Sequence, residues 1–412
     1  MIKRTTISLD ENFIKKIVEK YGSPIYIFDE KSFIDNFYNL KNTFCKYYPK
    51  YEIAYSYKTN YTPYICKLVK RLGGYAEVVS DFEYYIAKKI AYNSSGIIYN
   101  GPYKKELFLE HIRNNGINNI DNEQEALRII EFARKHRDVN IKLGIRVNID
   151  IGQNFISRFG LDPKSDEFIR VIDLVNATSN CEIVGIHCHV GQSRGLASWV
   201  SRVDRVIEII KKYFSNSKLE YIDLGSGMFG DMEEELSNQF SNVPTYEEYA
   251  KVISSRLLAY YRGYTVADLP ILFTEPGATA ISRYFFLVTK VMSKKTVRGR
   301  KIAGLDSSFF NAGETCRYKN LPVKVFSNGS IEKAIDLVGY TCLEEDVIYA
   351  NYCGSIDVGD IVVFGNVGGY STVFKPPFIM PDCAILVWKN NDVVELIKQQ
   401  QTYDDVLKNY LM

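Results

Sequence analysis

The run EIAYSY (residues 52–57), followed directly by Lys58, is the first of eight short β-like runs that alternate with longer helical patterns. In the segments between most of them, apolar residues recur at helical spacing. The eight runs cover residues 52–57, 75–79, 96–99, 117–120, 141–147, 182–189, 219–224 and 271–274, and helical patterns cover residues 61–71, 82–91, 122–135 and 197–213. Eight strand–helix units in about 240 residues are typical of a (β/α)8 barrel. A doubly wound open sheet is the alternative, because the number of strands does not prove closure.

The pattern changes after about residue 285. Runs at residues 285–291, 360–364 and 382–387 alternate in hydrophobicity and are separated by Gly, Asn and Pro, which is typical of an antiparallel β domain. The segment PIYIF (residues 24–28) could add a strand to that domain. We therefore expect an α/β fold, with a barrel formed by residues 31–280 and a C-terminal antiparallel β domain formed by residues 1–30 and 281–412.

Composition excludes several classes of protein. The chain has 412 residues and a formal net charge of +2, from 51 basic and 49 acidic residues, so its charge favours neither nucleic acid nor an anionic membrane as a partner. Residues 1–16 contain no apolar core of a signal peptide, and no apolar run approaches the roughly 20 residues of a membrane helix. The eight cysteines form no CxxC pairs, so we expect neither a zinc site nor a disulfide framework, and we expect a cytoplasmic protein.

Residues whose side chains could take part in catalysis or binding lie where the predicted strands end. In a barrel, the C-terminal strand ends and the loops after them form one rim, which is where active sites lie. The residues at these ends are Lys58, Glu77, Asn100, Asp121, Arg146, His189, Gly225 and Glu275. Their convergence predicts an active site.

Lys58 emerges from an apolar strand. Desolvation lowers the pKa of a lysine and favours Schiff-base chemistry. The alternative is an ordinary lysine at a strand end whose amine reaches solvent.

Two turns at later strand ends fit a phosphorylated ring. Gly225, Ser226 and Gly227 form a GSG turn, whose backbone N–H groups can approach a phosphate closely. Glu275 opens the turn Glu-Pro-Gly, where a carboxylate could pair with a protonated pyridine nitrogen. Tight structural turns use the same residue types, so each turn alone is weak evidence.

His187 and His189 are two of only four histidines, and their spacing on a strand puts both on one face. A metal pair is conceivable, but no third ligand is indicated and we expect no metal. The better functional interpretation is an imidazole that stacks on a flat cofactor ring. The structural alternative is a histidine that only packs inside the barrel. In the second domain, Cys342 stands before an acidic stretch, where a thiol could donate a proton; a lone cysteine is otherwise a small buried hydrophobe.

Six motifs together resemble one family over nearly the whole chain. They are AYSYKTN (54–60), GIHCHVGQS (185–193), DLGSGMFG (223–230), EPG (275–277), CLEED (342–346) and GNVGGYS (365–371). In content and order they are similar to motifs of the fold-type III decarboxylases that use pyridoxal 5′-phosphate, the group of diaminopimelate, ornithine and arginine decarboxylases.

The resemblance implies a cofactor, a reaction and a role for each matching residue. Lys58 would carry pyridoxal 5′-phosphate as a Schiff base, Glu275 would hold the pyridine nitrogen and His189 would stack on the ring. The expected cofactor-binding residues are Lys58, Glu77, Arg146, His189, Ser193, Gly225, Ser226, Gly227, Glu275, Gly277, Ala278 and Tyr370. Decarboxylation would pass through an external aldimine and a quinonoid carbanion.

The resemblance also implies a homodimer. Cys342 would reach the partner's site and protonate the carbanion, and Arg317, Glu344 and Asp346 are the expected substrate-binding residues, with Arg158 a weaker candidate. Diaminopimelate enzymes follow Glu-Pro-Gly with an arginine and follow the cysteine with a glutamate, where this chain has Ala278 and Leu343.

These two departures bear on the substrate. A missing bidentate arginine removes recognition of a distal carboxylate. The substrate is therefore expected to be a diamino acid or a conjugated amino acid, as in the antibiotic and siderophore branch of the family. The alternatives are a diaminopimelate decarboxylase of lysine biosynthesis, an amino-acid racemase, a non-catalytic protein that binds the cofactor, and a phosphate-binding barrel without it.

Overall fold

The computed structural model describes residues 9–152, 156–215, 217–389 and 393–411. The chain divides into two compact units, each of which is described by itself. The barrel unit comprises Phe37–Phe229 and Asn242–Thr279. The sheet unit comprises Met1–Asn36, Gly230–Ser241 and Ala280–Met412.

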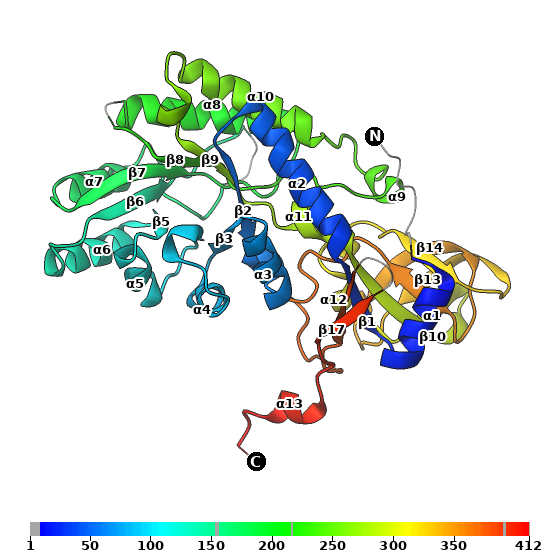
Figure 1. The fold of residues 1–412 in the computed structure, drawn as a ribbon. Coiled ribbons are helices and arrows are strands. Elements are labelled where there is room, and N and C mark those ends of the chain that lie inside the picture. Colours follow the sequence, from blue (N-terminus) through cyan, green and yellow to red (C-terminus); the bar gives the residue numbers. More distant parts are fainter. Residues whose placement is uncertain (1–8, 153–155, 216, 390–392, 412) are drawn as a thin grey trace. The chain divides into compact units, whose positions relative to one another are not determined.

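A closed barrel of eight parallel strands forms the centre of the barrel unit in the described part of the chain (Figure 1). The strands are β2 (Tyr51–Ser56), β3 (Tyr75–Val78), β4 (Ile97–Tyr99), β5 (Ile117–Ile120), β6 (Ile141–Arg146), β7 (Cys181–His187), β8 (Tyr221–Asp223) and β9 (Ile271–Thr274). The last strand pairs with the first, with Ile53 opposite Thr274, so the sheet closes. The predicted barrel is confirmed, and the open-sheet alternative is wrong.

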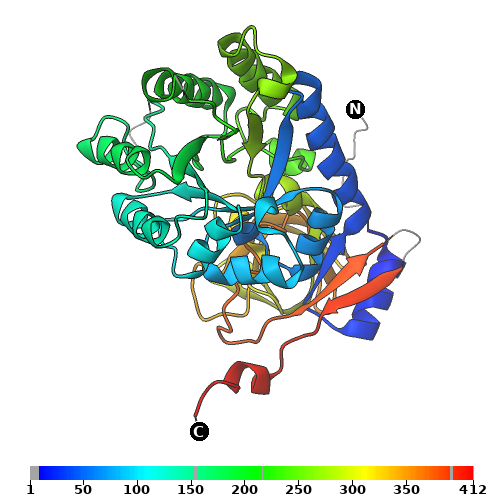
Figure 2. The ribbon, with the colours of Figure 1, turned by 60° about the vertical axis from the view of Figure 1, so that its left-hand side comes forward.

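Helices lie outside the barrel strands (Figure 2). They are α2 (Glu30–Tyr47), α3 (Pro63–Arg71), α4 (Asp81–Lys89), α5 (Leu107–Arg113), α6 (Glu123–Lys135), α7 (Asp166–Asn176), α8 (Leu196–Tyr213) and α10 (Tyr246–Tyr260). Polar side chains start several of them: Asn122 caps α6, Ser165 caps α7, and Thr245 forms a capping box with Glu248 at α10. The four helical segments predicted from the sequence are confirmed.

The barrel interior changes from apolar to polar along the strands. Ala54, Ile98, Tyr221 and Phe273 belong to one buried hydrophobic cluster. Side chains of a strand alternate between its two faces, so the residue two positions further along lies on the same face. Those residues are Ser56, Asn100, Asp223 and Glu275. An apolar layer of side chains therefore lies below a polar layer at the C-terminal ends of the strands, and we call this end of the barrel the mouth.

The sheet unit is built on a nine-stranded sheet. Its strands are β1 (Ile25–Asp29), β10 (Phe285–Val297), β11 (Arg300–Leu305), β12 (Val323–Phe326), β13 (Ile331–Val338), β14 (Val347–Ser355), β15 (Ile361–Phe364), β16 (Ala384–Trp388) and β17 (Val394–Lys398). Most neighbours are antiparallel, as predicted, but β1 with β16 and β11 with β13 are parallel. The early segment predicted to join this domain does so as β1, between β10 and β16.

Short helices complete the sheet unit. The helix α1 (Glu11–Tyr21) buries Ile14, Ile17 and Val18 in the hydrophobic core beside β1, β10 and β16. The other helices are α9 (Glu234–Ser237), α11 (Ala278–Ile281), α12 (Phe309–Ala312) and α13 (Tyr403–Leu407). In the described ranges, no helix combines the length and the apolar character needed to cross a bilayer.

Candidate active site

Each barrel strand places at least one buried polar side chain near its C-terminal end. We call these residues the polar ring: Ser56, Glu77, Asn100, Asp121, Arg146, His187, Asp223 and Glu275. Buried polar groups are costly unless they bond to one another or to a ligand. The ring is therefore the part of the barrel built for chemistry.

Lys58 lies in a 3-10 turn (Tyr57–Thr59) that directly follows β2. Its Nζ donates to Glu77 Oε2 at 2.6 Å and to Ser56 Oγ at 2.7 Å. The Glu77 side chain is only 1% exposed, whereas that of Lys58 is 31% exposed. The amine is thus held over a buried carboxylate and remains accessible from the mouth.

Glu275 and Asp223 form a coupled pair of buried carboxyl groups beside His187. One ligand atom from each of the three residues lies within 4.8 Å of the others, and His187 Nε2 is 3.2 Å from Glu275 Oε1 without hydrogen-bond geometry. Burial and the charge of Glu275 raise the pKa of Asp223. Burial opposes the charge of Glu275 as well, but His187 and Lys58 hold its pKa below the ordinary value. A proton shared by this pair therefore favours Asp223, and the negative charge favours Glu275.

The spacing around His187 bears on the prediction about metals. Asp223 and Glu275, rather than His189, are the donors that lie near it, so by distance this trio could hold a cation. The sequence did not indicate these two acids as partners of His187. The absence of a metal stays a prediction.

His189 is tied to the GSG turn. Its Nδ1 accepts the backbone N–H of Ser226 at 3.1 Å. Burial holds the pKa of His189 well below its ordinary value, so the ring is neutral and carries its proton on Nε2. A neutral, oriented imidazole suits contact with a flat ring.

Glycines are required in both turns by the space around them. Gly225 has φ +61° and Gly227 has φ +95°. A Cβ on Gly225 would lie 2.5 Å from His189 Nδ1, and one on Gly227 would lie 2.6 Å from the Val190 carbonyl oxygen. A Cβ on Gly277 would lie 2.0 Å from Thr59 Oγ1, so the Glu-Pro-Gly turn packs directly against the turn that holds Lys58. The two turns therefore pack closely against His189, Val190 and the turn that holds Lys58.

Arg202 of α8 fixes the GSG turn from behind. It is completely buried and its guanidinium donates to the carbonyl oxygens of Val190, Leu224 and Ser226 at 2.7, 3.0 and 2.8 Å. Its guanidinium also lies 3.9 Å from the centre of the Trp199 ring. Because C=O and N–H of a peptide unit point in opposite directions, the bond to Ser226 turns the next N–H away from Arg202. A buried cation behind the turn also favours an anion in front of it.

We expect Arg202→Lys to weaken binding of a phosphorylated cofactor by about tenfold or more. An ammonium group cannot hold three carbonyls in this geometry, and each unsatisfied buried group costs about 1–3 kcal/mol. Titration of the cofactor-free protein with pyridoxal phosphate measures the dissociation constant. Arg256→Lys is the control, since Arg256 pairs with Asp204 and holds no turn. An unchanged constant in Arg202→Lys would contradict this role.

Comparison with known proteins identifies the family. The pyridoxal-binding domain of the pyridoxal-dependent decarboxylases matches residues 34–282. The chain belongs to this family. It is a decarboxylase that uses pyridoxal phosphate, and its substrate class is an amino acid.

Individual relatives of the enzyme cover nearly its whole length. Diaminopimelate decarboxylase of Methanocaldococcus jannaschii is 24% identical over 95% of this chain and 92% of its own. The L-glutamyl-[BtrI acyl-carrier protein] decarboxylase of Niallia circulans is 24% identical over 98% of this chain and 97% of its own. The crystal structure of the M. jannaschii enzyme with L-lysine has a TM-score of 0.86 at 23% identity, and the match covers 100% of this chain and 99% of that one. The last comparison shows the shared fold.

The barrel unit brings most of the predicted cofactor residues of the decarboxylase together. Lys58 and Glu77 are in contact, Ser226 is bonded to His189, and Glu275 lies in the same polar ring. Arg146 also belongs to the polar ring, and its guanidinium donates to Asp121 at 3.1 Å and lies over the aromatic ring of Phe159. Arg158 is exposed, and its guanidinium lies over the same aromatic ring. Ser193 is half-buried in the loop after β7, and Ala278 is half-buried at the start of α11.

The sheet unit holds the remaining predicted residues. Cys342 and Glu344 are exposed, and Arg317 is exposed with its guanidinium 5.0 Å from the centre of the Phe309 ring. Tyr370 is half-buried with φ +60°. Each role stays a prediction.

Asp346, the other predicted substrate-binding residue, is buried in the same unit. Its Oδ1 accepts the N–H of Phe309 at 2.8 Å, and its Oδ2 accepts the N–H and hydroxyl of Thr341 at 3.1 and 2.6 Å. Both oxygens are therefore engaged in holding the loop that carries Cys342. A role toward the substrate stays a prediction for Asp346.

Sequence reasoning missed several residues that shape the site. Asp223 had a signal, because an acid inside an apolar run (LEYIDL) calls for an explanation. Arg202 had none, since an arginine on an amphipathic helix is normally a surface residue. Asn119 and Tyr221 are also part of the site, and their signal is a glycine in each of the two strands between them.

Glu83 of α4 gives the decarboxylase a pH dependence. Its carboxylate accepts the N–H of Val79 at 2.8 Å, and burial raises its pKa to about 7. A raised pKa means that the folded state binds the proton more tightly than the unfolded chain, so stability is lost as pH rises from about 4.5 to about 7.

We expect Glu83→Gln to remove this loss, which is at most about 1.4 kcal/mol per pH unit. Gln keeps the acceptor for Val79. Urea midpoints at pH 5, 6 and 7 measure the slope. Glu131→Gln, an exposed position on α6, should leave the slope unchanged, and an equal slope in Glu83→Gln and the parent would refute the assignment.

Proposed function

We propose that this enzyme decarboxylates an amino acid whose distal end is conjugated or bound to a carrier, rather than free diaminopimelate. The observation that carries the decarboxylase site is one connected set of contacts. Lys58 contacts Glu77, and Asn100 donates to both Glu77 and Glu275, at 3.2 and 2.5 Å. An amine and a buried anion thus share one polar mouth.

The preference for a conjugated substrate rests on two positions and one relative. Ala278 and Leu343 are apolar where the diaminopimelate enzymes have an arginine and a glutamate for the distal carboxylate and amine. Without them, a free charged end would lose its buried partners, which costs several kcal/mol of recognition. The Niallia circulans relative is named for a substrate carried on a protein.

We assign the residues of the barrel unit as follows. Lys58 would hold the cofactor through its aldehyde carbon, with Glu77 Oε2 accepting a proton from Nζ and the aldehyde oxygen leaving as water. Glu275 would face the ring nitrogen and keep a proton there, and His189 would orient the ring. The cofactor, when bound, takes up the electron pair left on the α-carbon as carbon dioxide departs. Glu275 argues against an amino-acid racemase with this type of barrel, which is expected to have an arginine at the ring nitrogen.

The phosphate would lie against the glycine turns. Gly225, Ser226, Gly227 and Gly277 would border it, and Arg202 holds the first three in position. The N–H of Gly225 donates to Asp223 Oδ1 and that of Ser226 to His189 Nδ1, so the N–H of Gly227 is the donor that this turn would offer.

We further propose a homodimer in which Cys342 of one copy serves the site of the other and returns a proton to the α-carbon. Its exposed thiol and the buried anchor Asp346 fit a loop that presents a proton donor. The eight cysteines lie in the described ranges, and all are free thiols, which fits the reducing cytoplasm. Mixing Lys58→Ala with Cys342→Ala subunits tests the shared site: recovered activity supports it, and none excludes it.

The substrate proposal is tested by carbon dioxide release from a panel of free diamino acids and conjugated or carrier-bound amino acids, with Lys58→Ala as the blank. We expect a conjugated compound to have the highest kcat/KM. Free diaminopimelate turning over as fast as the best conjugate would overturn the proposal. Stereoinversion without carbon dioxide release would overturn the reaction itself.

A further inference from the structure

Asn100 joins the two carboxylates that the proposed function uses. Its Nδ2 donates to Glu275 Oε1 at 2.5 Å and to Glu77 Oε1 at 3.2 Å. All three side chains are buried. The amide thus supplies a hydrogen bond to each carboxylate without adding a charge, and its bond to Glu275 favours the ionised form of that group.

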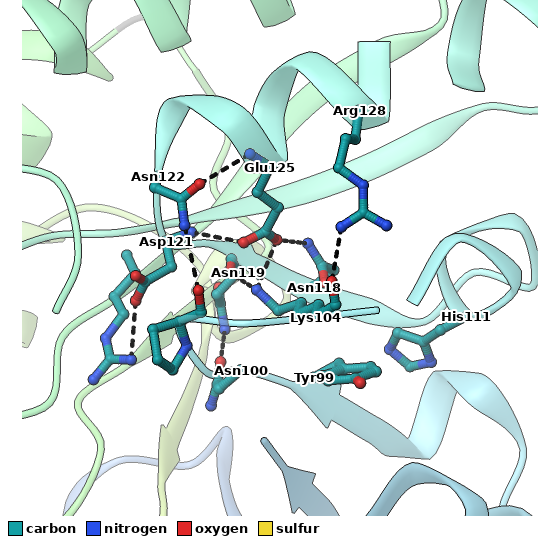
Figure 3. Close-up of polar contacts among 12 residues, drawn as sticks. Tyr99, Asn100, Lys104, His111, Asn118, Asn119, Asp121, Asn122, Glu125 and Arg128 are labelled. Carbon is teal, nitrogen blue, oxygen red and sulfur yellow. Dashed lines mark hydrogen bonds and ion pairs between the residues drawn. The ribbon is translucent and has the colours of Figure 1, made fainter. Parts of the chain in front are cut away.

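The orientation of this amide is fixed by a second amide. Asn119 Nδ2 donates to Asn100 Oδ1 at 2.8 Å, and Figure 3 shows the two side chains pointing at one another. If Asn100 were turned over, its oxygen would face two carboxylates and its NH₂ would face another NH₂. Asn119 therefore holds the donor side of Asn100 toward the acids.

Asn119 is oriented in turn by Tyr221. The Tyr221 hydroxyl donates to Asn119 Oδ1 at 2.7 Å, and burial raises the pKa of Tyr221 so that it stays protonated. Turning Asn119 over would place an NH₂ against this O–H donor. The three side chains form a chain of fixed polarity, which we call the amide relay (Asn100, Asn119 and Tyr221).

The barrel makes room for this relay with two glycines. Across β5 to β8, Asn119 is the register partner of Gly144, Gly144 of Gly185, and Gly185 of Tyr221. A Cβ on Gly144 would lie 1.9 Å from Asn119 Oδ1, and a Cβ on Gly185 would lie 2.0 Å from the Tyr221 ring. The phenol of β8 thus passes over two strands to reach β5. Packing alone does not require such an arrangement.

The backbone beneath the relay is also anchored. The fully buried Lys104 donates to the Asn119 carbonyl oxygen at 2.8 Å and to Glu125 Oε1 at 2.6 Å (Figure 3). Asn118 and the N–H of Asp121 donate to the same carboxylate at 3.0 and 3.2 Å. The strand that carries Asn119 is therefore held on both sides.

We propose that Asn100, Asn119 and Tyr221 are positioning residues that hold the Glu77 and Glu275 carboxylates in place and keep Glu275 ionised, so that Glu275 can hold a proton on the ring nitrogen of the cofactor. This inference rests on the proposed role of Glu275. The titratable groups that lie near Glu275 are His187, His189, Lys58 and Asp223. The relay adds to them a bond that does not titrate.

Tyr221→Phe tests the relay without touching either carboxylate. It removes one hydroxyl, leaves Asn119 free to turn, and keeps the ring that fills the barrel. We expect the acid limb of the kcat profile, and the pH at which pyridoxal phosphate binding to the cofactor-free protein weakens, to move up by about one pH unit. At neutral pH, kcat should fall several-fold with KM little changed. Asn100→Leu should shift both profiles further, by about two units, because it removes both donors.

Tyr48→Phe is the matched control. Tyr48 is a completely buried tyrosine of the same unit, and its hydroxyl donates to the Pro270 carbonyl oxygen at 2.8 Å, outside the polar ring. If Tyr221→Phe loses thermal stability as Tyr48→Phe does but keeps the parent pH profiles, the relay is only structural and the proposal is overturned. Glu275→Gln distinguishes failure of the relay from failure of the role proposed for Glu275. If Glu275→Gln keeps the acid limb of the parent enzyme, the role of Glu275 at the ring nitrogen is also wrong.

Discussion

Lys58→Ala should abolish decarboxylation and remove the absorbance band of the lysine-bound cofactor at about 420 nm. The turn that carries Lys58 brings the primary amine next to Glu77, its proton acceptor at 2.6 Å. Loss of both covalent attachment and proton transfer predicts a fall in kcat of at least about 10⁴-fold. Absorbance spectra and carbon dioxide release measure the two effects.

Lys67→Ala is the control for this experiment. Lys67 is exposed on α3, the helix that follows the Lys58 turn, and its removal should change neither the spectrum nor the rate. A band that survives unchanged in Lys58→Ala would mean that another amine carries the cofactor.

Lys104→Met should produce the largest loss of stability. The side chains of Lys104 and Glu125 are 0% and 6% exposed, and burial lowers the pKa of Lys104. Removing one partner of a buried ion pair leaves an uncompensated charge and costs about 3–5 kcal/mol. In a unit of this size, that corresponds to a fall in Tm of at least about 6 °C by calorimetry.

Two further variants make this measurement specific. Lys104→Met with Glu125→Gln removes both charges and should recover much of the lost stability. Lys135→Met breaks a pair with Glu131 whose side chains are 67% and 70% exposed, and it should cost no more than about 0.5 kcal/mol. Equal costs at the buried and the exposed pair would contradict the argument.

The barrel could be predicted because its signal is local. Each strand is a short run with apolar alternation, each helix has its own period, and all eight strands lie within two residues of their predicted bounds. The rim followed from the same signal, since parallel strands end on one side. The positions of Lys58, Glu77 and Glu275 at this rim could therefore be predicted from sequence alone, and their roles stay predictions.

What could not be predicted depends on contacts across the fold. Tyr221 and Asn119 are 102 residues apart, and only the register of four strands brings them together. The raised pKa of Asp223 follows from its burial and from its nearness to Glu275, which strand order alone does not give. In the sheet unit, the parallel pairing of β1 with β16 depends on which edge the chain returns to after 350 residues or more.

The bare backbone at Gly144 and Gly185 has a consequence for redesign. A methyl group at either position would clash with the Tyr221 phenol that crosses there. It would therefore break the hydrogen-bonded connection from β8 to the carboxylates of Glu77 and Glu275. Mutating these two sites would therefore retune the electronics of the bound ring while leaving every group that meets substrate chemically intact. A library aimed at new reactivity should include them even though they touch nothing that reacts.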